Sequence, residues 1–204
     1  MIYRCERITF YLVIFIFYIL CSCKGRASIV QQDAVVSTND NNLNRLLVEN
    51  EALLNKLNNS YLNDSIKFEN FKTGNLVGAK ELFESGRHLV LQYSELDCDV
   101  CVDSALNDFQ RYAKKIGVNN VVVLAAADNR RYMANFVRLN KFHLDNIYLI
   151  PLRDCKSLYV MTPGMPFLYI TDGMLKLTNT FIPRKELPAL SKSYYKKIEN
   201  MFIN

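Results

Sequence analysis

The sequence has no strong excess of charge of either sign. Its 25 Lys and Arg and 20 Asp and Glu give a formal net charge of +5 at pH 7. The basic residues are scattered, and they form no stripe interleaved with aromatic side chains, as nucleic-acid-binding surfaces do. The locally basic segment SKSYYKKIENMF (191–202) is typical of a solvated helix face. We therefore expect no nucleic-acid partner.

Histidines and closely spaced cysteine pairs, the usual ligands of zinc and copper, are also scarce. The chain has only two histidines and a single C-x-x-C pair, Cys98 and Cys101. This pair could supply two ligands to zinc or copper, with Cys155 and His143 completing the set. However, there is no second C-x-x-C, and His143 stands alone in the sequence. We expect neither a metal site nor a cofactor.

The most apolar stretch near the N-terminus is too short for a membrane-spanning helix. Ile8–Leu20 is 13 residues long, whereas a span needs about 20 residues. Arg4 and Arg7 precede it, which is the charge pattern of an export signal. The positive end also predicts that the rest of the chain lies outside the cytoplasm.

This stretch ends in Leu20-Cys21-Ser22-Cys23, which resembles a bacterial lipobox with Cys23 as the lipidated residue. Residues 1–23 are therefore predicted to be a lipoprotein signal peptide, after which acyl chains on Cys23 would hold the protein to a membrane. An uncleaved N-terminal anchor is the alternative. Both interpretations predict a protein of the cell envelope, and the lipobox predicts a membrane lipoprotein that faces the periplasm.

The length and composition fit one domain with appendages. Half of the 204 residues are hydrophobic and 22% are charged, enough for a real core. Residues 24–61 are predicted to be a polar tether followed by an amphipathic helix, because leucines recur at helical spacing from Leu43 to Leu57. That helix either packs on its own domain or, with Asn50 at a central position, forms a coiled coil. Residues 62–204 are expected to be the folded domain.

The chain is organised around the segment Leu89–Ala105. An apolar, strand-like run meets a polar turn, and Cys98 and Cys101 then open a helix that ends at Gly117. At a helix start, free backbone N–H groups and the helix dipole stabilise a thiolate. The spacing also lets the two sulfurs close a small disulfide ring, so that the pair can carry two electrons. This pattern predicts thiol–disulfide chemistry.

The remaining patterns predict an α/β domain with a sheet covered on both faces. His88 begins the central strand and is expected to be a structural residue. The uninterrupted apolar run VVVLAAA (121–127) is typical of a strand buried on both faces. The other expected elements are a strand at 65–71, a helical connection at 76–87, a helix after Asn129, a strand or extended segment at 146–151, a hairpin from Phe167 to Ile182 turning tightly at Asp172-Gly173, and a C-terminal helix.

This order resembles the thioredoxin fold, a three-layer sandwich around a central mixed sheet. With the hairpin-like segment at 65–83 and the lipoprotein signal, residues 62–202 are similar to the TlpA-like thiol–disulfide oxidoreductases, lipoproteins common in Bacteroidetes-type bacteria. The resemblance implies that Pro166, which opens the hairpin after Met165, lies beside the C-x-x-C pair with a cis peptide bond. It also implies that the Met165 backbone binds the substrate.

The chain departs from this family at several positions. Asp97 stands where the family usually has tryptophan, and the sequence contains no tryptophan at all. Ser104 and Leu106 stand where the family often has glutamate and proline. The fold assignment does not depend on these residues, but the activity does.

In the enzymatic interpretation, Cys98 is the nucleophile and Cys101 resolves the mixed disulfide. Four nearby acids, Glu95, Asp97, Asp99 and Asp103, should disfavour a thiolate and keep the pKa of Cys98 above that in strongly oxidising relatives. A less stable thiolate makes the couple more reducing. The expected partners are disulfides and thiols of exported proteins and a membrane electron donor.

Two alternatives remain open for these cysteines. Cys98 and Cys101 could form a structural disulfide in a non-catalytic lipoprotein that binds a partner beside Pro166. Cys155 is either a spectator thiol or a third participant in the exchange. A peroxidase of the peroxiredoxin type would need a Pro and a Thr or Ser at set positions before its cysteine, and Ser94 and Glu95 do not supply them.

Overall fold

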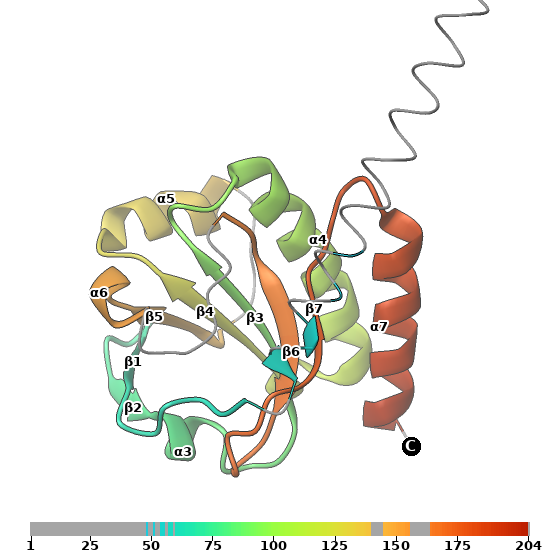
Figure 1. Cartoon of the computed structure of the whole chain (residues 1–204). Helices are drawn as coiled ribbons and strands as arrows, with labels where there is room; N and C mark the ends of the chain where they lie inside the picture. The colour runs from blue at the N-terminus through green and yellow to red at the C-terminus, as the bar shows by residue number, and fades with distance from the viewer. Residues whose placement is uncertain are drawn as a thin grey trace, which may run out of the picture. The chain divides into compact units, whose positions relative to one another are not determined.

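The seven strands of the domain form one mixed sheet in the order β2-β1-β5-β4-β3-β6-β7 (Figure 1). The structure is a computed structural model that describes residues 48, 51, 54, 55, 57, 58, 60–139, 145–155 and 164–203. Its strands are β1 (Lys67–Asn70), β2 (Leu76–Gly78), β3 (His88–Ser94), β4 (Val121–Ala126), β5 (Ile147–Ile150), β6 (Phe167–Thr171) and β7 (Thr178–Phe181). Its helices are α3 (Ala79–Leu82), α4 (Asp99–Ile116), η1 (Val118–Asn120), α5 (Arg130–Leu139), α6 (Leu152–Cys155) and α7 (Pro188–Ile203).

The centre of the sheet is parallel and fully buried. β3 pairs with β4 in the register Leu89↔Val121, and β4 pairs with β5 in parallel. Every residue of β3 and β4 is buried, as expected for strands whose two faces are both covered. The edges β2–β1 and β6–β7 are antiparallel.

Successive side chains of β3 enter two different cores, because side chains alternate across a strand. In the first core, Leu89 and Leu91 pack with residues of α4, α5 and α7. In the second core, on the opposite face, Val90 packs with Phe68 and Phe83. The sheet is therefore the middle layer of three. The predicted α/β, thioredoxin-like three-layer arrangement is confirmed for the described residues.

α7 lies beside α4 on one face of the sheet (Figure 1). The rings of Tyr112 and Tyr195 stack with centroids 4.2 Å apart. Lys115 Nζ forms an ion pair with Glu199 at 3.2 Å. In the part of the chain that the structure describes, no helix is long and apolar enough to cross a membrane.

The segment before β3 combines the two arrangements that the sequence suggested. Leu76–Gly78, expected from the residues to be helical, is strand β2 and pairs with β1, so the hairpin-like segment is confirmed. Only Ala79–Leu82 is helical. The turn between β1 and β2 closes around Asn70, whose side-chain oxygen accepts hydrogen bonds from the backbone N–H groups of Lys72 and Thr73.

The β6–β7 hairpin is present, and the chain turns tightly at Asp172-Gly173 as predicted, because the Leu175 N–H donates to Asp172 O at 2.8 Å. The second strand does not follow this turn directly. β7 begins only at Thr178. The intervening residues pair with the segment before β1, because Leu62 N–H donates to Leu175 O and Leu177 N–H donates to Ser60 O, both at 2.8 Å. This pairing buries the side chains of Leu175 and Leu177 in the second core. A hairpin in which β7 began directly after Gly173 would not bury them in this way.

The end of the predicted amphipathic helix packs on the domain. The described residues from Val48 to Leu57 are all helical. Leu57 belongs to the second core, and Thr180 Oγ1 donates to Leu54 O at 3.4 Å. Residues 50–204 form one compact unit. These contacts favour the alternative in which the helix packs on its own domain over a coiled coil. Asn50 and the signal peptide lie outside the described residues.

Candidate functional site

The C-x-x-C pair lies where β3 passes into α4, at the carboxyl end of the parallel strands. β3 ends at Ser94, and the Glu95 N–H donates to Ala126 O at 2.9 Å, which fixes the start of the turn against β4. Cys98 is the N-cap of α4, with extended backbone (φ −61°, ψ 114°). Its carbonyl accepts hydrogen bonds from the N–H groups of Cys101 and Val102, both at 2.9 Å. The predicted strand–turn–helix arrangement is therefore present.

The two sulfurs are in direct contact, and they differ in exposure. Cys98 is exposed and Cys101 is half-buried. Both are free thiols in this structure, and Cys101 Sγ donates a hydrogen bond to Cys98 Sγ at 2.9 Å. An accessible sulfur therefore accepts a hydrogen bond from a protected one, which is the arrangement expected for an attacking and a resolving thiol.

This contact shifts the pKa values of the two thiols in opposite directions. The hydrogen bond from Cys101 Sγ is the largest cause of a lowered pKa at Cys98, followed by the backbone N–H of Cys101. The Val100 N–H and the Lys185 ammonium act in the same direction. Burial raises the pKa of Cys101 to about 11, and its donated hydrogen bond adds to this rise. Cys98 is therefore the thiol that ionises first.

The four acids around the pair do not act as the sequence suggested. None of them is among the groups that shift the pKa of Cys98. Glu95, Asp99 and Asp103 instead raise the pKa of Tyr132, after burial of that residue and the hydrogen bond that its hydroxyl donates to Asp99 Oδ1 at 3.2 Å. Of these acids, Asp99 contacts α5 directly through Tyr132. The expectation that these acids raise the pKa of Cys98 is therefore wrong. That this pKa lies above the value in strongly oxidising relatives stays a prediction.

Asp97 is the exception among these acids, because it is buried, with 8% of its surface exposed. Its Oδ2 accepts a hydrogen bond from the Ser94 N–H at 2.9 Å, and its own N–H donates to Ser94 O at 3.0 Å. Burial raises the pKa of Asp97, and the backbone amides of Ser94 and Gly164 lower it. The burial of this acid was not predicted, although Asp97 stands where the resembled family usually has tryptophan.

The segment predicted to bind substrate approaches the pair through Gly164. The amide of Gly164 acts on the carboxyl group of Asp97, the residue that precedes Cys98. Met165 follows and is half-buried, and Pro166 is buried at the start of β6. The position predicted for Met165 and Pro166 beside the turn is thus consistent with the structure, although their role in binding stays a prediction.

The predicted cis bond before Pro166 is wrong in this structure. No cis peptide bond occurs within the described residues, so Met165–Pro166 is trans. Gly164 provides the change of direction with φ of +90°, a value that glycine adopts without a steric penalty. Trans is also the favoured isomer of most X–Pro bonds.

Two residues of the site come from a turn that sequence reasoning did not include. Lys185 and Glu186 lie between β7 and α7, and their charges act on Cys101 in opposite directions. Lys185 also acts on Cys98. No motif marks these residues, and they lie more than 80 positions after the cysteines, so only the tertiary fold brings them close.

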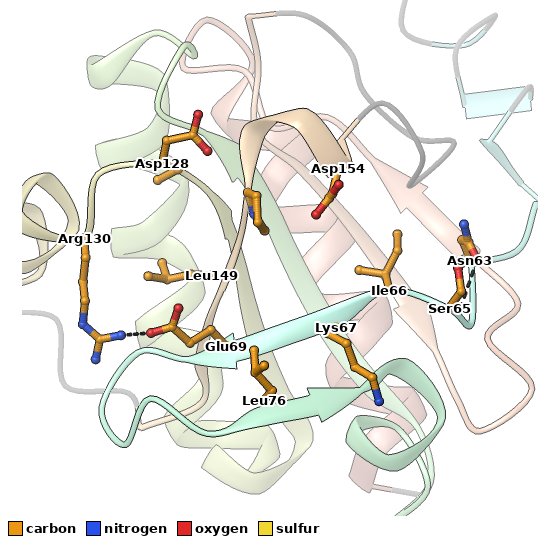
Figure 2. A pocket seen from close by; sticks show the side chains of 12 residues that line it. Asn63, Ser65, Ile66, Lys67, Glu69, Leu76, Asp128, Arg130, Leu149 and Asp154 are labelled. Carbon is orange, nitrogen blue, oxygen red and sulfur yellow. Dashed lines mark hydrogen bonds and ion pairs between the residues drawn. The ribbon is translucent and has the colours of Figure 1, made fainter.

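A cavity of about 570 Å³ opens at the same end of the sheet, among residues that follow β4 and β5 and residues of β1. Figure 2 shows Arg130 turned toward Glu69, with which it forms an ion pair. Asp128 Oδ1 accepts a hydrogen bond from the Leu152 N–H at 2.8 Å. These groups are partnered within the protein, and nothing else in the cavity points to a particular ligand.

Among the described residues, no group of three His, Cys, Asp or Glu side chains could hold a metal ion. His143 and Cys23 lie outside the described residues, as does the side chain of Cys155. The structure therefore brings together Cys98 and Cys101, and it brings Gly164 near Asp97, the residue before Cys98.

Comparison with known proteins identifies the fold. No family model and no curated protein matches the sequence. The structure is similar to a thiol:disulfide interchange protein from Bacteroides sp. (TM-score 0.54, 15% identity, 72% of this chain and 91% of that chain). It is also similar to a mutant PrxQ from Xylella fastidiosa (TM-score 0.52, 12% identity, 70% of this chain and 95% of that chain). At these identities the similarities show the fold alone, which is thioredoxin-like, of the type found in thiol–disulfide oxidoreductases.

Proposed function

We propose that this protein is a membrane-anchored thiol–disulfide oxidoreductase that reduces disulfides of exported proteins through Cys98 and Cys101. The observation that supports this most strongly is the 2.9 Å hydrogen bond from Cys101 Sγ to the exposed Cys98 Sγ at the start of α4. It stabilises the thiolate, the nucleophilic form of cysteine, on the accessible sulfur. The thioredoxin-like fold is consistent with this chemistry.

The reaction would proceed in two exchanges. The Cys98 thiolate attacks one sulfur of the substrate disulfide, whose S–S bond breaks, and the leaving substrate thiolate takes up a proton. Cys101 then loses its proton and attacks Cys98 Sγ, which releases the second substrate thiol. Two electrons pass to the substrate, and Cys98 and Cys101 end as a disulfide. The Met165 backbone would bind the substrate segment in extended form, and Pro166 would fix the end of that surface.

Reduction is the proposed direction because the thiolate on Cys98 has little charge support. Lys185, the ion that stabilises it among the described residues, belongs to an exposed turn and is screened by solvent. Strong oxidants depend on a strongly stabilised thiolate, since this favours their reduced form. We expect a reduction potential closer to the about −270 mV of thioredoxin than to the about −120 mV of DsbA.

The proposal places the domain at the periplasmic face of a membrane, held by acyl chains on Cys23. A reductase in an oxidising compartment needs a supply of electrons. A membrane dithiol protein is the proposed donor, reducing the Cys98–Cys101 disulfide by the same exchange in reverse.

The test is the reduction potential of the purified full-length protein in detergent, equilibrated in thiol buffers, with thiols counted by mass spectrometry. We expect a reversible two-electron couple that Cys98→Ser abolishes. Turnover is then measured with a disulfide-bonded protein substrate and a dithiol donor.

A disulfide that resists reduction until the protein unfolds would contradict the proposal. That result would favour the alternative, a non-catalytic lipoprotein in which Cys98 and Cys101 form a structural disulfide. The exposed side chains of Leu96 and Val100 on either side of Cys98 would then be candidates for partner binding.

A further inference from the structure

We propose that Asp97 is a positioning residue whose buried carboxyl group holds the Gly164–Pro166 segment against the Cys98 turn. Its consequence for catalysis rests on the proposed function, because the segment is the proposed substrate-binding surface. The structural link itself can be tested without any activity.

Asp97 is held in place by hydrogen bonds within the turn between β3 and α4. Ser94 and Asp97 exchange two hydrogen bonds, of 2.9 Å from the Ser94 N–H to Asp97 Oδ2 and of 3.0 Å from the Asp97 N–H to Ser94 O. The Leu96 N–H donates to Ser94 Oγ at 3.1 Å. This small network closes the turn between β3 and α4 and leaves the carboxyl group little freedom to move.

One oxygen of this buried carboxyl group, Oδ1, is still able to accept a hydrogen bond. Asp97 Oδ1 is buried and has no hydrogen-bond partner among the described residues. A buried, unsatisfied oxygen is costly and calls for an explanation. The backbone amide of Gly164 lowers the pKa of this same carboxyl group, and we infer that it is the donor toward which the buried oxygen is directed.

Gly164 lies where the chain turns into the proposed substrate-binding segment. It directly precedes Met165 and Pro166, and its φ of +90° turns the chain into β6. Asp97 directly precedes Cys98, the N-cap of α4. The Asp97–Gly164 contact therefore joins two segments 67 positions apart at the points where each enters the proposed site. It occurs at the position where the TlpA-like proteins, which this chain resembles, usually have tryptophan.

Hydrogen exchange measured on the full-length protein in detergent tests the link directly. In Asp97→Ala, we expect the Gly164 amide to exchange about tenfold faster, because the buried carboxyl group that would attract this N–H is removed. Asp97→Asn keeps the side-chain volume and one acceptor, so its Gly164 amide should exchange at an intermediate rate. Asp99→Asn is the matched control, since Asp99 lies on the other side of Cys98 and contacts Tyr132; it should leave the exchange unchanged.

Kinetics then separate positioning from thiol chemistry. We expect Asp97→Ala to raise KM for a disulfide-bonded protein about tenfold, while the alkylation of Cys98 by iodoacetamide keeps its rate and pH profile. A general loosening of the turn would change alkylation as well.

The outcomes are distinct. Unchanged Gly164 exchange in Asp97→Ala, or equal effects in Asp99→Asn, would overturn the positioning role. If Asp97→Ala fails to fold, unchanged exchange of the Gly164 amide in Asp97→Asn would overturn the positioning role instead. If the wild-type protein reduces no disulfide, the proposed function fails, while hydrogen exchange still decides whether Asp97 holds Gly164. If the exchange changes but KM does not, the contact is structural only and the role in substrate binding is overturned.

Discussion

Cys98 and Cys101 occupy one helical turn and yet have opposite properties. One is exposed with a lowered pKa, and the other is half-buried with a pKa of about 11. The difference comes from the sulfur–sulfur hydrogen bond and from the depth of each side chain at the start of α4. At neutral pH the pair should therefore behave as one reactive and one protected thiol.

Removing the donor should make Cys98 less reactive. In Cys101→Ala the hydrogen bond to Cys98 Sγ is lost, and we expect the pKa of Cys98 to rise, so that its alkylation profile moves to higher pH. Iodoacetamide alkylation followed by mass spectrometry across pH measures this. Ser104→Ala, an exposed change on the same helix, serves as the control. An unchanged profile in Cys101→Ala would show that the hydrogen bond does not tune Cys98.

His88 has the structural role that the sequence suggested. Its Nδ1 donates to Gly86 O at 3.0 Å, and its Nε2 contacts Ser85 Oγ at 3.2 Å. Its ring meets that of Phe83 edge to face. Burial lowers the pKa of His88 below its ordinary value of 6.5, and the Gly86 hydrogen bond partly opposes this shift.

The lowered pKa of His88 predicts a loss of stability in mild acid. As the pH falls below about 6.5, the unfolded chain binds a proton at His88 before the folded protein does, so the free energy of unfolding decreases. Above that pH the contribution is fully present. Urea unfolding at about pH 7.5 and about pH 5.5 tests this, and the decrease should be smaller in His88→Gln. Equal decreases in both proteins would assign the effect to other groups.

At the scale of elements, segments far apart in sequence complete one another. The residues between β6 and β7 pair with residues 60–62, and Leu177 is fully buried by this contact. β2 extends the opposite edge of the sheet and exposes 67% of the Leu76 surface. The hairpin of β6 and β7 therefore depends on the N-terminal segment, whereas β2 contributes little apolar burial through this residue.

This difference predicts unequal costs for two leucine truncations. Leu177→Ala should lower the free energy of unfolding by about 2–5 kcal/mol, because it leaves a cavity in the second core. Leu76→Ala should change it by less than about 0.5 kcal/mol, since that side chain is mostly in solvent. Chemical unfolding compares both with the wild type. Similar values for the two variants would contradict the burial of Leu177 in the second core.

At the scale of the whole molecule, the site lies at one end of the central sheet. Cys98 follows β3, Gly164 precedes β6, and Lys185 follows β7. In α/β sheets, binding sites form outside the carboxyl ends of the parallel strands. The rest of the domain holds these loops in place through two cores that cover both faces of the sheet.

The proposed anchor makes a prediction for the entire protein. Cys23→Ala should abolish labelling by a radioactive fatty acid in a lipoprotein-exporting bacterium. It should also move the protein from the membrane fraction to the soluble fraction or leave it as an unprocessed precursor. Cys21→Ala is the control and should keep the label. Labelling that persists without Cys23 would contradict the predicted lipobox.

Local sequence determined much of the fold and the reactive pair. The buried strands β3 and β4 and the helix α4 follow from apolar patterns that each segment contains by itself, and the C-x-x-C spacing fixed the two sulfurs within one turn. The resemblance to thioredoxin-like proteins then predicted the order of the layers.

Tertiary structure alone decided how the site is charged and completed. The sequence suggested four acids acting together on Cys98, but in the fold Glu95, Asp99 and Asp103 raise the pKa of Tyr132, and Asp97 is buried. The fold also brings Lys185 near the cysteines and Gly164 near Asp97 from distant positions in the sequence. Periodicity reports which side of a strand or helix is apolar, whereas electrostatics and hydrogen bonding depend on distances in space. These distances exist only after the sheet has brought its loops together.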